Sequence, residues 1–342
     1  MRKQKLKFSN KEVEYIFNGS FAQLPTMFQR DKVVIVTDEN VFKLHGDKME
    51  GFAVIKLPAG EEFKHQRTVD DIITQLLELQ ADKQTILVGV GGGVVTDMAG
   101  YAASIYKRGI SLVLVPTSIL AMVDAAVGGK NGVDVGPFKN MVGTIYQPEH
   151  LIFDYSFLQT LPHEEWVNGF AEIIKHACIQ DAAFFDFLAS SSVEDFKNDP
   201  MLLADLLEKN IDIKTKVVLN DEFETGDRKL LNFGHTIGHA IENLYNLPHG
   251  HAVSIGMVCA CSISETINDF PAEGKQKLVE VLQRYELPTQ LSFDKESIWD
   301  ILLMDKKRAN NAMSFILLDK IGEAKVVAIP LPQLKDLIDQ CL

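Results

Sequence analysis

Short apolar runs alternate with helical patterns over the first 150 residues, and this alternation limits the fold more than any other feature of the chain. Four runs rich in β-branched residues are typical of buried strands: residues 32–38, 52–57, 85–90 and 111–115. Between the second and third runs, residues 68–80 carry apolar side chains at helical spacing. Strands that alternate with helices predict βαβ units, so we expect an α/β fold with a parallel sheet here.

The pattern changes after about residue 155 of the 342. The long helical patterns and then the strand-like runs that follow cover residues 164–179, 201–219, 235–245, 252–267, 274–285, 314–318 and 325–329. We therefore predict two domains: an α/β domain over residues 1–155 and a mainly helical domain over residues 156–342.

The composition excludes several classes of protein. Apolar residues make up 46% of the chain, which is enough to bury a sizeable core and excludes intrinsic disorder. Lysine and arginine number 34 against 47 aspartates and glutamates, and a net charge of −13 is a poor match for nucleic acid or an anionic membrane. The longest apolar run, residues 252–263, is too short to cross a bilayer. We therefore expect a soluble, cytoplasmic protein that binds neither nucleic acid nor membrane.

Disulfides and secretion are not expected either. Cys178, Cys259, Cys261 and Cys341 are too few and too unevenly spaced for a disulfide framework or a cysteine-based zinc site. The first ten residues, MRKQKLKFSN, are charged but no hydrophobic stretch follows them, so we expect no secretory signal.

Three consecutive glycines, residues 91–93, connect the predicted strand at 85–90 to a predicted helix. Glycines at such a turn let a ligand approach the backbone, and the N-terminus of the helix favours a phosphate group. The spacing departs from the dinucleotide fingerprint, because Val94 stands where that motif requires glycine. Pyrophosphate binding and a simple tight turn are therefore alternatives, and Asp97 either caps the helix or binds a ribose.

Two further segments concentrate basic residues in this acidic chain. Residues 124–140 form a second glycine-rich segment that carries Lys130 and Lys139. We expect a loop that binds an anionic substrate or a phosphate, with an ordinary solvated loop as the alternative. The cluster at residues 305–308 is either the solvated end of a helix or a second anion-binding segment.

A buried carboxylate is predicted in the helix at residues 164–179. Glu172, Lys175 and His176 share one helical face because they lie three and four residues apart. Apolar residues flank Glu172 on both sides, and burying its charge without a partner would cost several kcal/mol. Glu172 must therefore meet a cation, either Lys175 or a metal ion.

Four of the nine histidines fall within 17 residues: His235, His239, His249 and His251. The first two are one helical turn apart, so their imidazoles share a face. A glycine inside this helix costs about 1 kcal/mol relative to alanine, which indicates that something needs a close approach there. Together with Glu172, this cluster favours a two-histidine, one-carboxylate zinc site with an open position. The spacing alone does not select the second histidine.

Six segments, taken in order, resemble the 3-dehydroquinate synthase family: GGGVVTDMAGYAAS, YKRGI, VPTSILAMVDAAVGGKNGVD, KNMVGTIYQP, NGFAEIIKH and RKLLNFGHTIGHAIE. The resemblance implies a Rossmann-like N-terminal domain, a mainly helical C-terminal domain, bound NAD, a divalent metal (Zn²⁺ or Co²⁺) and a homodimer. It also implies conversion of 3-deoxy-D-arabino-heptulosonate 7-phosphate to 3-dehydroquinate and phosphate. In that reaction the substrate is oxidised transiently with NAD, loses phosphate, is reduced again and closes its ring by an aldol step.

Matched position by position, the resemblance implies Glu172, His235 and His249 as metal ligands. His239 matches a histidine that contacts the substrate phosphate, and Arg108 matches an arginine that reaches the active site of the neighbouring subunit. The other matched substrate contacts are Lys130, Asn140, Lys175, Lys214, Arg228, Asn232 and one of Lys306 or Lys307. The matched cofactor contacts are Asp38, Asn40, Glu61, Lys64, Gly92, Gly93, Val94, Asp97, Thr117, Ser118, Asp124, Lys130, Lys139, Phe157 and Thr160.

Two positions depart from the pattern of that family. His251 stands where the family usually has glutamate, which adds an imidazole that could compete with His249 for the metal. Asn131 follows Lys130 where threonine is commoner, and this affects positioning rather than the reaction.

Three other functions compete with this one. Another sugar-phosphate cyclase, which makes an inosose or a valiolone, is less favoured because Arg228, Lys214 and Asn232 match the branch with a carboxylate substrate. A metal-dependent polyol dehydrogenase of the glycerol dehydrogenase type would leave Lys130 and Asn140 without a purpose. A non-catalytic NAD or metal sensor would be expected to have lost a ligand, and none is lost.

Overall fold

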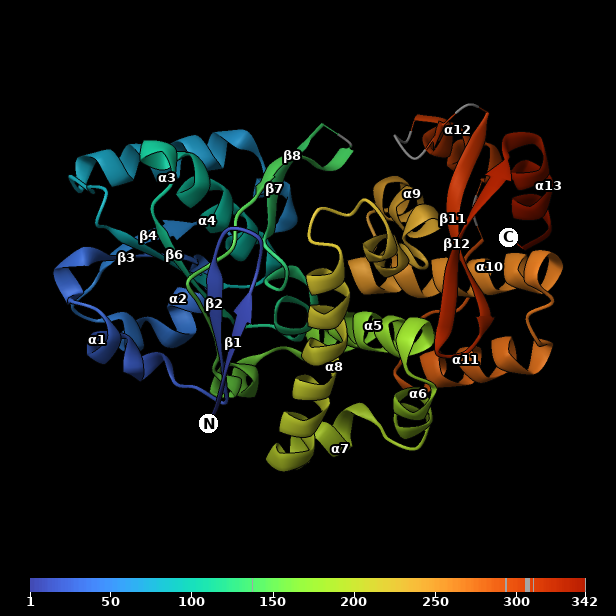
Figure 1. Cartoon of the computed structure of the whole chain (residues 1–342), viewed down its shortest axis with the longest axis horizontal. Helices are drawn as coiled ribbons and strands as arrows, with labels where there is room; N and C mark the ends of the chain where they lie inside the picture. The colour runs from blue at the N-terminus through green and yellow to red at the C-terminus, as the bar shows by residue number, and fades with distance from the viewer. Residues whose placement is uncertain (137, 293, 305–307, 310, 342) are drawn as a thin grey trace. The chain divides into compact units, whose positions relative to one another are not determined.

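The computed structural model describes residues 1–136, 138–292, 294–304, 308–309 and 311–341 (Figure 1). The chain divides into two compact units: Met1–Glu165 with Ala204–Thr215, and Trp166–Leu203 with Lys216–Leu342. The first boundary between the units follows Glu165, later than the expected boundary at residue 155. Residues Ala204–Thr215, which were expected in the helical domain, belong to the first unit.

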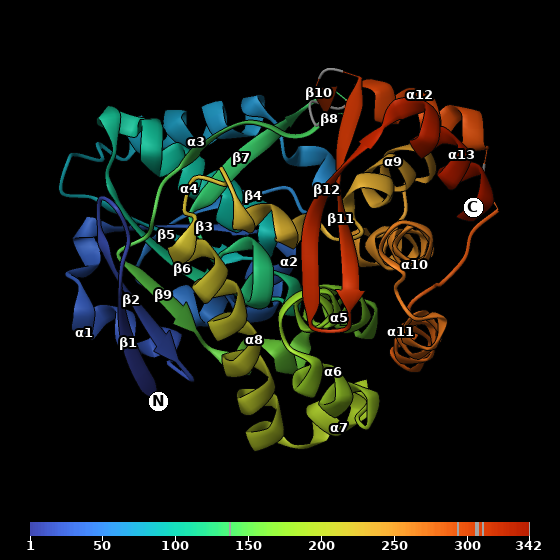
Figure 2. The ribbon, with the colours of Figure 1, turned by 45° about the vertical axis from the view of Figure 1, so that its right-hand side comes forward.

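A seven-stranded sheet forms the centre of the first unit, in the order β1-β2-β9-β6-β5-β3-β4 (Figures 1 and 2). Its strands are β1 (Arg2–Lys7), β2 (Glu12–Phe17), β3 (Val33–Asp38), β4 (Ala53–Leu57), β5 (Ile86–Gly91), β6 (Ser111–Pro116) and β9 (His150–Phe153). All neighbouring strands are parallel except the antiparallel pair β1 and β2. The expected α/β fold with a parallel sheet is confirmed.

The central strands are buried at almost every position, which explains their continuous apolar runs. No residue of β3, β5 or β6 is exposed. Both faces of the sheet are therefore covered, as in parallel sheets generally. The helices of this unit are α1 (Leu24–Met27), α2 (Glu39–His45), α3 (Gln66–Glu78) and α4 (Gly93–Ile105). Val33, Ile35, Val88 and Val113 belong to an apolar cluster that also includes Leu24 of α1, with Val41 and Phe42 of α2 packed against it.

The segment expected to be a glycine-rich loop is largely a β-hairpin, so the expectation of a loop was wrong, while its binding of an anion stays a prediction. β7 (Lys130–Val135) pairs antiparallel with β8 (Phe138–Ile145), and Gly132 lies directly opposite Gly143. A Cβ atom on Gly143 would lie 2.0 Å from the carbonyl oxygen of Asn131. These glycines therefore serve the close approach of two strands rather than the mobility of a loop.

The second unit combines helices with a small antiparallel sheet. Its helices, some of which begin or pass through residues of the first unit, are α5 (His163–Gln180), α6 (Ala182–Ala189), α7 (Val193–Asn198), α8 (Pro200–Asn220), α9 (His235–Tyr245), α10 (His249–Asn268), α11 (Ala272–Arg284), α12 (Lys295–Met304) and α13 (Leu331–Cys341). Its strands are β10 (Arg308–Ala309), β11 (Ala312–Lys320) and β12 (Glu323–Pro330). Each helix and strand expected after residue 155 is present, with ends that differ by a few residues.

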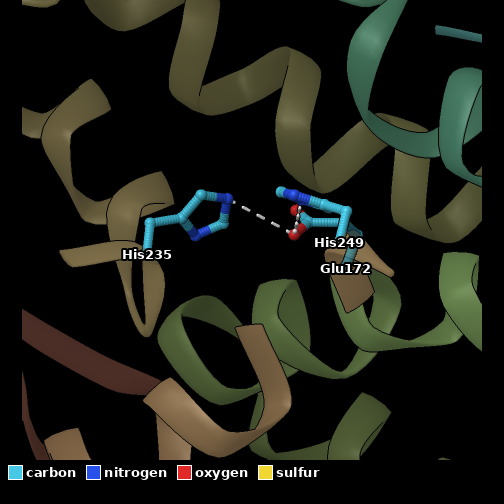
Figure 3. A group of neighbouring side chains, drawn as sticks. All are labelled: Glu172, His235 and His249. Atoms are coloured by element: carbon cyan, nitrogen blue, oxygen red, sulfur yellow. Dashed lines mark ion pairs between the residues drawn. The ribbon is translucent and has the colours of Figure 1, made fainter. Parts of the chain in front are cut away.

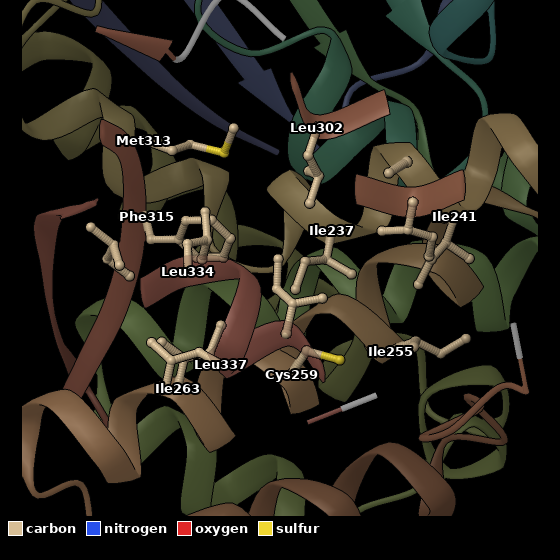
Figure 4. Close-up of a cluster of buried hydrophobic side chains, with 14 of the residues drawn as sticks. Ile237, Ile241, Ile255, Cys259, Ile263, Leu302, Met313, Phe315, Leu334 and Leu337 are labelled. Atoms are coloured by element: carbon tan, nitrogen blue, oxygen red, sulfur yellow. The ribbon is translucent and has the colours of Figure 1, made fainter. Parts of the chain in front are cut away.

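One apolar cluster holds this unit together (Figure 4). Ile237 and Ile241 of α9, Ile255 of α10, Leu302 of α12 and Phe315 of β11 are each at most 2% exposed. At about 25 cal/mol per Å² of buried apolar surface, the burial of such side chains stabilises the packing of α9 on α10. The cluster thus supports the two helices that begin with His235 and His249.

Helix α10 is longer than the apolar run expected at residues 252–263. It has 20 residues, and among the described helices it alone is long and apolar enough, by length and composition, to span a bilayer. The expectation that the apolar segment here is too short to do so is corrected. Of its most apolar window, 67% is buried inside the protein. Its apolar residues, such as Ile255, Cys259 and Ile263, belong to the core cluster.

Candidate active site

Glu172 is a fully buried carboxylate in the middle of α5. Every residue from Trp166 to Ile179 is buried, so α5 crosses the interior of its unit. Lys175, one turn later on the same face, donates a hydrogen bond to the Glu172 Oε2 atom. His176 Nε2 lies 3.9 Å from the same oxygen. The predicted shared face of these three residues is confirmed.

The other oxygen of Glu172 faces two histidines (Figure 3). His235 Nε2 lies 3.5 Å from Oε1, and His249 Nε2 lies 3.4 Å from it. One donor atom from each of the three residues falls within 4.8 Å of the others. One carboxylate oxygen and two imidazole nitrogens at this separation form a donor set suited to a divalent cation such as zinc, with room for further ligands.

Both histidines are the first residues of their helices. His235 follows Gly234, whose φ of +77° places it in the left-handed region. A Cβ atom there would lie 2.6 Å from Met257 Cγ, so glycine is needed for conformation and for space. His249 follows Pro248, which ends the loop before α10. The chain therefore brings the imidazoles together by where α9 and α10 begin.

The two histidines differ in electrostatic surroundings. The pKa of His235 is lowered to about 3. Burial is the main cause, and the positive charge of Lys175 lowers the pKa by more than Glu172 raises it. Burial also lowers the pKa of His249, but its hydrogen bonds to Glu172 and Glu242 outweigh this and raise it to about 10. His235 is thus a neutral imidazole at physiological pH, the form that binds metals, whereas His249 releases its Nε2 proton when it binds one.

His239 and His251 were the other histidines of the predicted cluster. The ring of His239 lies 5.1 Å from that of His235 and 6.2 Å from that of His249, measured between centroids. With Glu242 and His249 it forms a second group of donor atoms within 4.8 Å. His251 is half-buried, and no such group among the described residues includes it.

Arg228 and Asn232 lie in the segment that leads into α9. Arg228 is 2% exposed, and its guanidinium donates to the carbonyl oxygen of Glu222. Asn232 Nδ2 donates to Glu224 Oε1 at 2.9 Å. The segment therefore holds both expected substrate residues with local hydrogen bonds.

Asp221 organises this segment, and the sequence analysis missed it. Its carboxylate accepts hydrogen bonds from the backbone N–H groups of Thr225 (2.9 Å), Gly226 (2.7 Å) and Arg228 (3.1 Å). The Thr225 hydroxyl donates to it as well. An aspartate followed closely by glycine is a turn signal, but that signal does not show that Asp221 anchors Arg228.

The carboxyl ends of three parallel strands gather further expected residues in the first unit. Asp38 ends β3 and caps α2, Gly92 follows β5, and Thr117 and Ser118 follow β6. The Thr117 N–H donates to the carbonyl oxygen of Gly91 at 2.9 Å, which links two of these ends. Crevices at the carboxyl ends of parallel strands are the usual ligand-binding positions of such sheets.

The glycine turn packs tightly, and pyrophosphate binding there stays a prediction. A Cβ atom on Gly91 would lie 2.5 Å from Val95 Cβ, so Gly91 is required for tight packing of α4 on β5. A Cβ atom on Gly92 would have Ser118 Oγ as its nearest neighbour, at 3.7 Å, so there is space for a ligand to approach the Gly92 backbone. Gly93 and Val94 begin α4, so their N–H groups lie at the helix N-terminus that favours phosphate.

Five expected residues form one polar network in this unit. Lys64 Nζ lies 2.7 Å from Asp97 Oδ2 and donates to Asn140 Oδ1 at 2.7 Å. Lys139 pairs with Glu61 at 3.1 Å. Burial raises the pKa of Asp97 to about 6 even though Lys64 opposes this. Asp97 lies within α4 and does not cap it, so the capping alternative was wrong.

Asp134 joins this network and was also missed. Its carboxylate accepts from the backbone N–H of Asn140 at 2.6 Å and lies 3.6 Å from Lys139 Nζ. Its own N–H donates to the Lys64 carbonyl oxygen at 2.8 Å. The pairing of β7 with β8 brings Asp134 close to Lys139 and Asn140.

Lys214 and Asp124 form a second ion pair in the first unit. Lys214 Nζ lies 2.7 Å from Asp124 Oδ1, and Lys214 is 6% exposed. Asp124 lies in the π-helical turn Ala121–Ala125. Lys130 begins β7 and is exposed.

The remaining expected residues have other surroundings. Phe157 is buried in the core of the first unit with its ring 4.7 Å from that of His45, and Thr160 Oγ1 lies 2.7 Å from His45 Nε2. Asn40 is exposed on α2. Arg108 is exposed, with a left-handed φ of +62°. Lys306 lies outside the described residues.

Comparison with known proteins gives a consistent result. Residues 54–168 match the family model for the N-terminal region of 3-dehydroquinate synthase, and residues 169–308 match that for its C-terminal region. The 3-dehydroquinate synthase of Campylobacter concisus is 39% identical over 315 residues, covering 89% of this chain and 90% of the relative. That of Saccharolobus solfataricus is 41% identical over 297 residues, covering 84% of each.

Solved structures of related synthases have the same fold. A 2-deoxy-scyllo-inosose synthase complexed with carbaglucose-6-phosphate, NAD⁺ and Co²⁺ is 25% identical, with a TM-score of 0.87 over 100% of both chains. A 2-epi-5-epi-valiolone synthase from Streptomyces hygroscopicus with NAD⁺ and Zn²⁺ is 25% identical, with a TM-score of 0.88 over 100% of this chain and 99% of that one. A probable glycerol dehydrogenase from Sinorhizobium meliloti, at 15% identity and a TM-score of 0.63 over 96% of this chain and 95% of that one, shares the fold.

The hydrogen bonds to Asp221 predict a pH dependence of stability. Burial would raise the pKa of Asp221, but the donors Gly226, Thr225 and Arg228 outweigh it and lower the pKa from 3.8 to about 2. A carboxyl group with a lowered pKa in the folded state stabilises it above pH 3.8, and this contribution is lost as the pH falls toward 2. We expect Asp221→Asn to lower the urea midpoint at pH 7, and the difference from wild type to shrink below about pH 4.

The exposed neighbour Asp227 gives the matched control. Asp227→Asn should leave the free energy of unfolding within about 0.5 kcal/mol of wild type at every pH, as surface substitutions usually do. A wild-type minus Asp221→Asn difference that stays constant or grows between pH 4 and pH 3 would contradict the proposed hydrogen-bonded anchor.

Proposed function

The chain belongs to the 3-dehydroquinate synthase family, and we propose that Glu172, His235 and His249 hold the divalent metal ion of its active site. The enzyme converts 3-deoxy-D-arabino-heptulosonate 7-phosphate to 3-dehydroquinate and phosphate, a step of aromatic amino acid biosynthesis. NAD and a divalent metal such as zinc or cobalt are its cofactors. The observation that carries the metal proposal is the convergence of three ligand atoms within 4.8 Å in the interior of the second unit.

The metal fits this position because of the chemistry of the donors. A cation beside Glu172 balances a carboxylate that is fully buried, and two imidazoles leave positions open for substrate oxygens. When bound, the metal polarises substrate hydroxyl groups, and NAD accepts and returns a hydride. Lys175 orients Glu172 from the opposite oxygen and neutralises part of its charge. We propose that Lys175 also contacts substrate hydroxyl groups.

The basic and amide residues of the chain hold a substrate with several negative charges. We propose that Arg228 binds the substrate carboxylate, because a planar guanidinium can form two parallel hydrogen bonds to it. Lys214 is proposed to bind the same end of the substrate. His239 and Asn232 in the second unit, with Lys130, Asn140 and one of Lys306 or Lys307, are proposed to bind the phosphate. Holding the phosphate in place lets it accept the proton that elimination releases, so the protein needs mainly to position its substrate.

The carboxyl edge of the sheet in the first unit is the proposed NAD site. The glycine turn offers backbone N–H groups at a helix N-terminus to the pyrophosphate. The polar network around Lys64 and Asp97 offers hydrogen bonds to a ribose. Proposed cofactor contacts are Asp38, Asn40, Glu61, Lys64, Gly92, Gly93, Val94, Asp97, Thr117, Ser118, Asp124, Lys130, Lys139, Phe157 and Thr160.

The proposed function includes a homodimer and a cytoplasmic location. Arg108 is exposed on a left-handed turn, where it can reach a neighbouring subunit and bind the substrate phosphate there. The cytoplasm is supported by Cys178 and Cys261, which are free and buried.

The stoichiometry of the reaction tests the function. Because the hydride is returned within each turnover, phosphate should be released in proportion to the sugar acid consumed, with no net formation of NADH. Phosphate release and absorbance at the NADH band are measured in the same sample. A polyol dehydrogenase would accumulate one NADH per alcohol oxidised, and such accumulation without phosphate release would contradict the assignment.

Metal content tests the ligand set. We expect chelation to abolish activity, and both His249→Ala and Glu172→Gln to lose most of the bound metal at micromolar zinc. His251→Ala provides the matched control, because this histidine lies two residues along α10 and outside the ligand groups. Full metal occupancy in His249→Ala together with loss in His251→Ala would show that the wrong histidine is assigned.

Subunit mixing tests the role of Arg108. Arg108→Ala and Lys175→Ala should each be inactive, because one lacks a phosphate contact and the other lacks the partner of Glu172. If Arg108 acts in the neighbouring subunit, heterodimers of the two variants contain one intact site and should recover up to about half of the wild-type activity per dimer. Verified heterodimers without any recovery would exclude a shared site.

A further inference from the structure

Glu242 lies beside the proposed metal site without being one of its ligands. Its Oε2 atom is 3.3 Å from Nδ1 of His249, and its side chain is 11% exposed. The opposite ring nitrogen of His249, Nε2, is the one that faces Glu172 at 3.4 Å. The imidazole of His249 thus lies between two carboxylates, one on each nitrogen.

The fold holds this contact from two sides. Glu242 lies seven residues after His235 on α9, so both residues project from the same face of that helix. The neighbouring helix α10, which begins with His249, approaches α9 closely because Gly238 carries no side chain. A Cβ atom on Gly238 would lie 3.1 Å from the Ala252 carbonyl oxygen. The separation of Glu242 from His249 is therefore set by backbone packing.

Hydrogen bonding at one ring nitrogen decides what the other can do. An imidazole that donates its Nδ1–H to a carboxylate keeps its Nε2 lone pair free for a metal, and the carboxylate also makes that nitrogen a stronger donor. Such partners also fix the rotation of the ring, so that less freedom is lost when the metal binds.

We propose that Glu242 is a positioning residue that accepts the Nδ1–H of His249 and so directs its Nε2 atom to the metal. This inference rests on the proposed assignment of Glu172, His235 and His249 as ligands. It assigns to α9 two contributions to one site: a ligand at its first residue and the orienting carboxylate two turns later.

Zinc affinity of the purified full-length protein, measured by competition with a chromophoric chelator, tests the inference. Removal of an orienting carboxylate typically weakens metal binding 10–100-fold, and we expect this loss in Glu242→Gln and Glu242→Ala. Glu242→Asp keeps the charge and should recover part of the affinity. Asn243→Ala, at the next position of α9, is the control and should bind zinc as tightly as wild type. Wild-type affinity in both Glu242→Gln and Glu242→Ala would overturn the inference.

A second measurement separates orientation from direct ligation and from misfolding. The absorption spectrum of the Co²⁺-loaded protein reports the ligands themselves. In Glu242→Gln at saturating Co²⁺ it should keep the wild-type spectral character, which also shows that the variant is folded at the site. A spectrum that loses this character, or a His239→Ala variant that loses zinc as strongly as Glu242→Gln, would show that the metal is bound by His239, Glu242 and His249 instead.

The failure of the ligand assignment would look different. If His235→Ala retained wild-type zinc affinity, the proposed metal site itself would be wrong. If His235→Ala lost zinc while the Glu242 variants did not, the ligand assignment would stand and only the role of Glu242 would fall.

Discussion

The negative charge of Glu172, placed where no water can solvate it, is the constraint on which the second unit depends. A carboxylate in a low-dielectric interior is costly unless cations and hydrogen-bond donors surround it. Lys175 supplies one from the same helix, and His235 and His249 approach from the starts of α9 and α10. Three helices are thereby held around one functional group, and an apolar cluster joins two of them, α9 and α10.

The strands and helices that the sequence predicted are those marked by a continuous apolar run or by apolar residues at helical spacing. β3, β5 and β6 are buried on both faces, so each is rich in valine, isoleucine and leucine. β1 was missed because its charged residues alternate with few apolar ones, as expected for a strand at the edge of a sheet. The hairpin of β7 and β8 was taken for a loop because its glycines, which allow two backbones to approach, resemble the glycines of a flexible segment.

The candidate site was predictable as far as helical periodicity reaches. The shared face of Glu172, Lys175 and His176 follows from spacing alone, and the structure confirms it. The geometry that groups His249 with Glu172, and leaves His251 outside, depends on where α10 begins relative to α5 and α9, which spacing does not encode. Asp221 and Glu242 were missed for the same reason, since each acts through a hydrogen bond to a group that only folding brings near.

The glycines at the contact of α9 with α10 affect which amino-acid substitutions this enzyme can tolerate. Because Gly238 meets the backbone of α10, and Gly256 meets that of Gly234, the spacing of these helices is set by main-chain contact and not by the size of core side chains. Substitutions among the surrounding isoleucines can then accumulate, or be engineered, without moving the histidines. Altered substrate preference is therefore more accessible through residues 221–232, which hold Arg228 and Asn232 and precede this rigid pair.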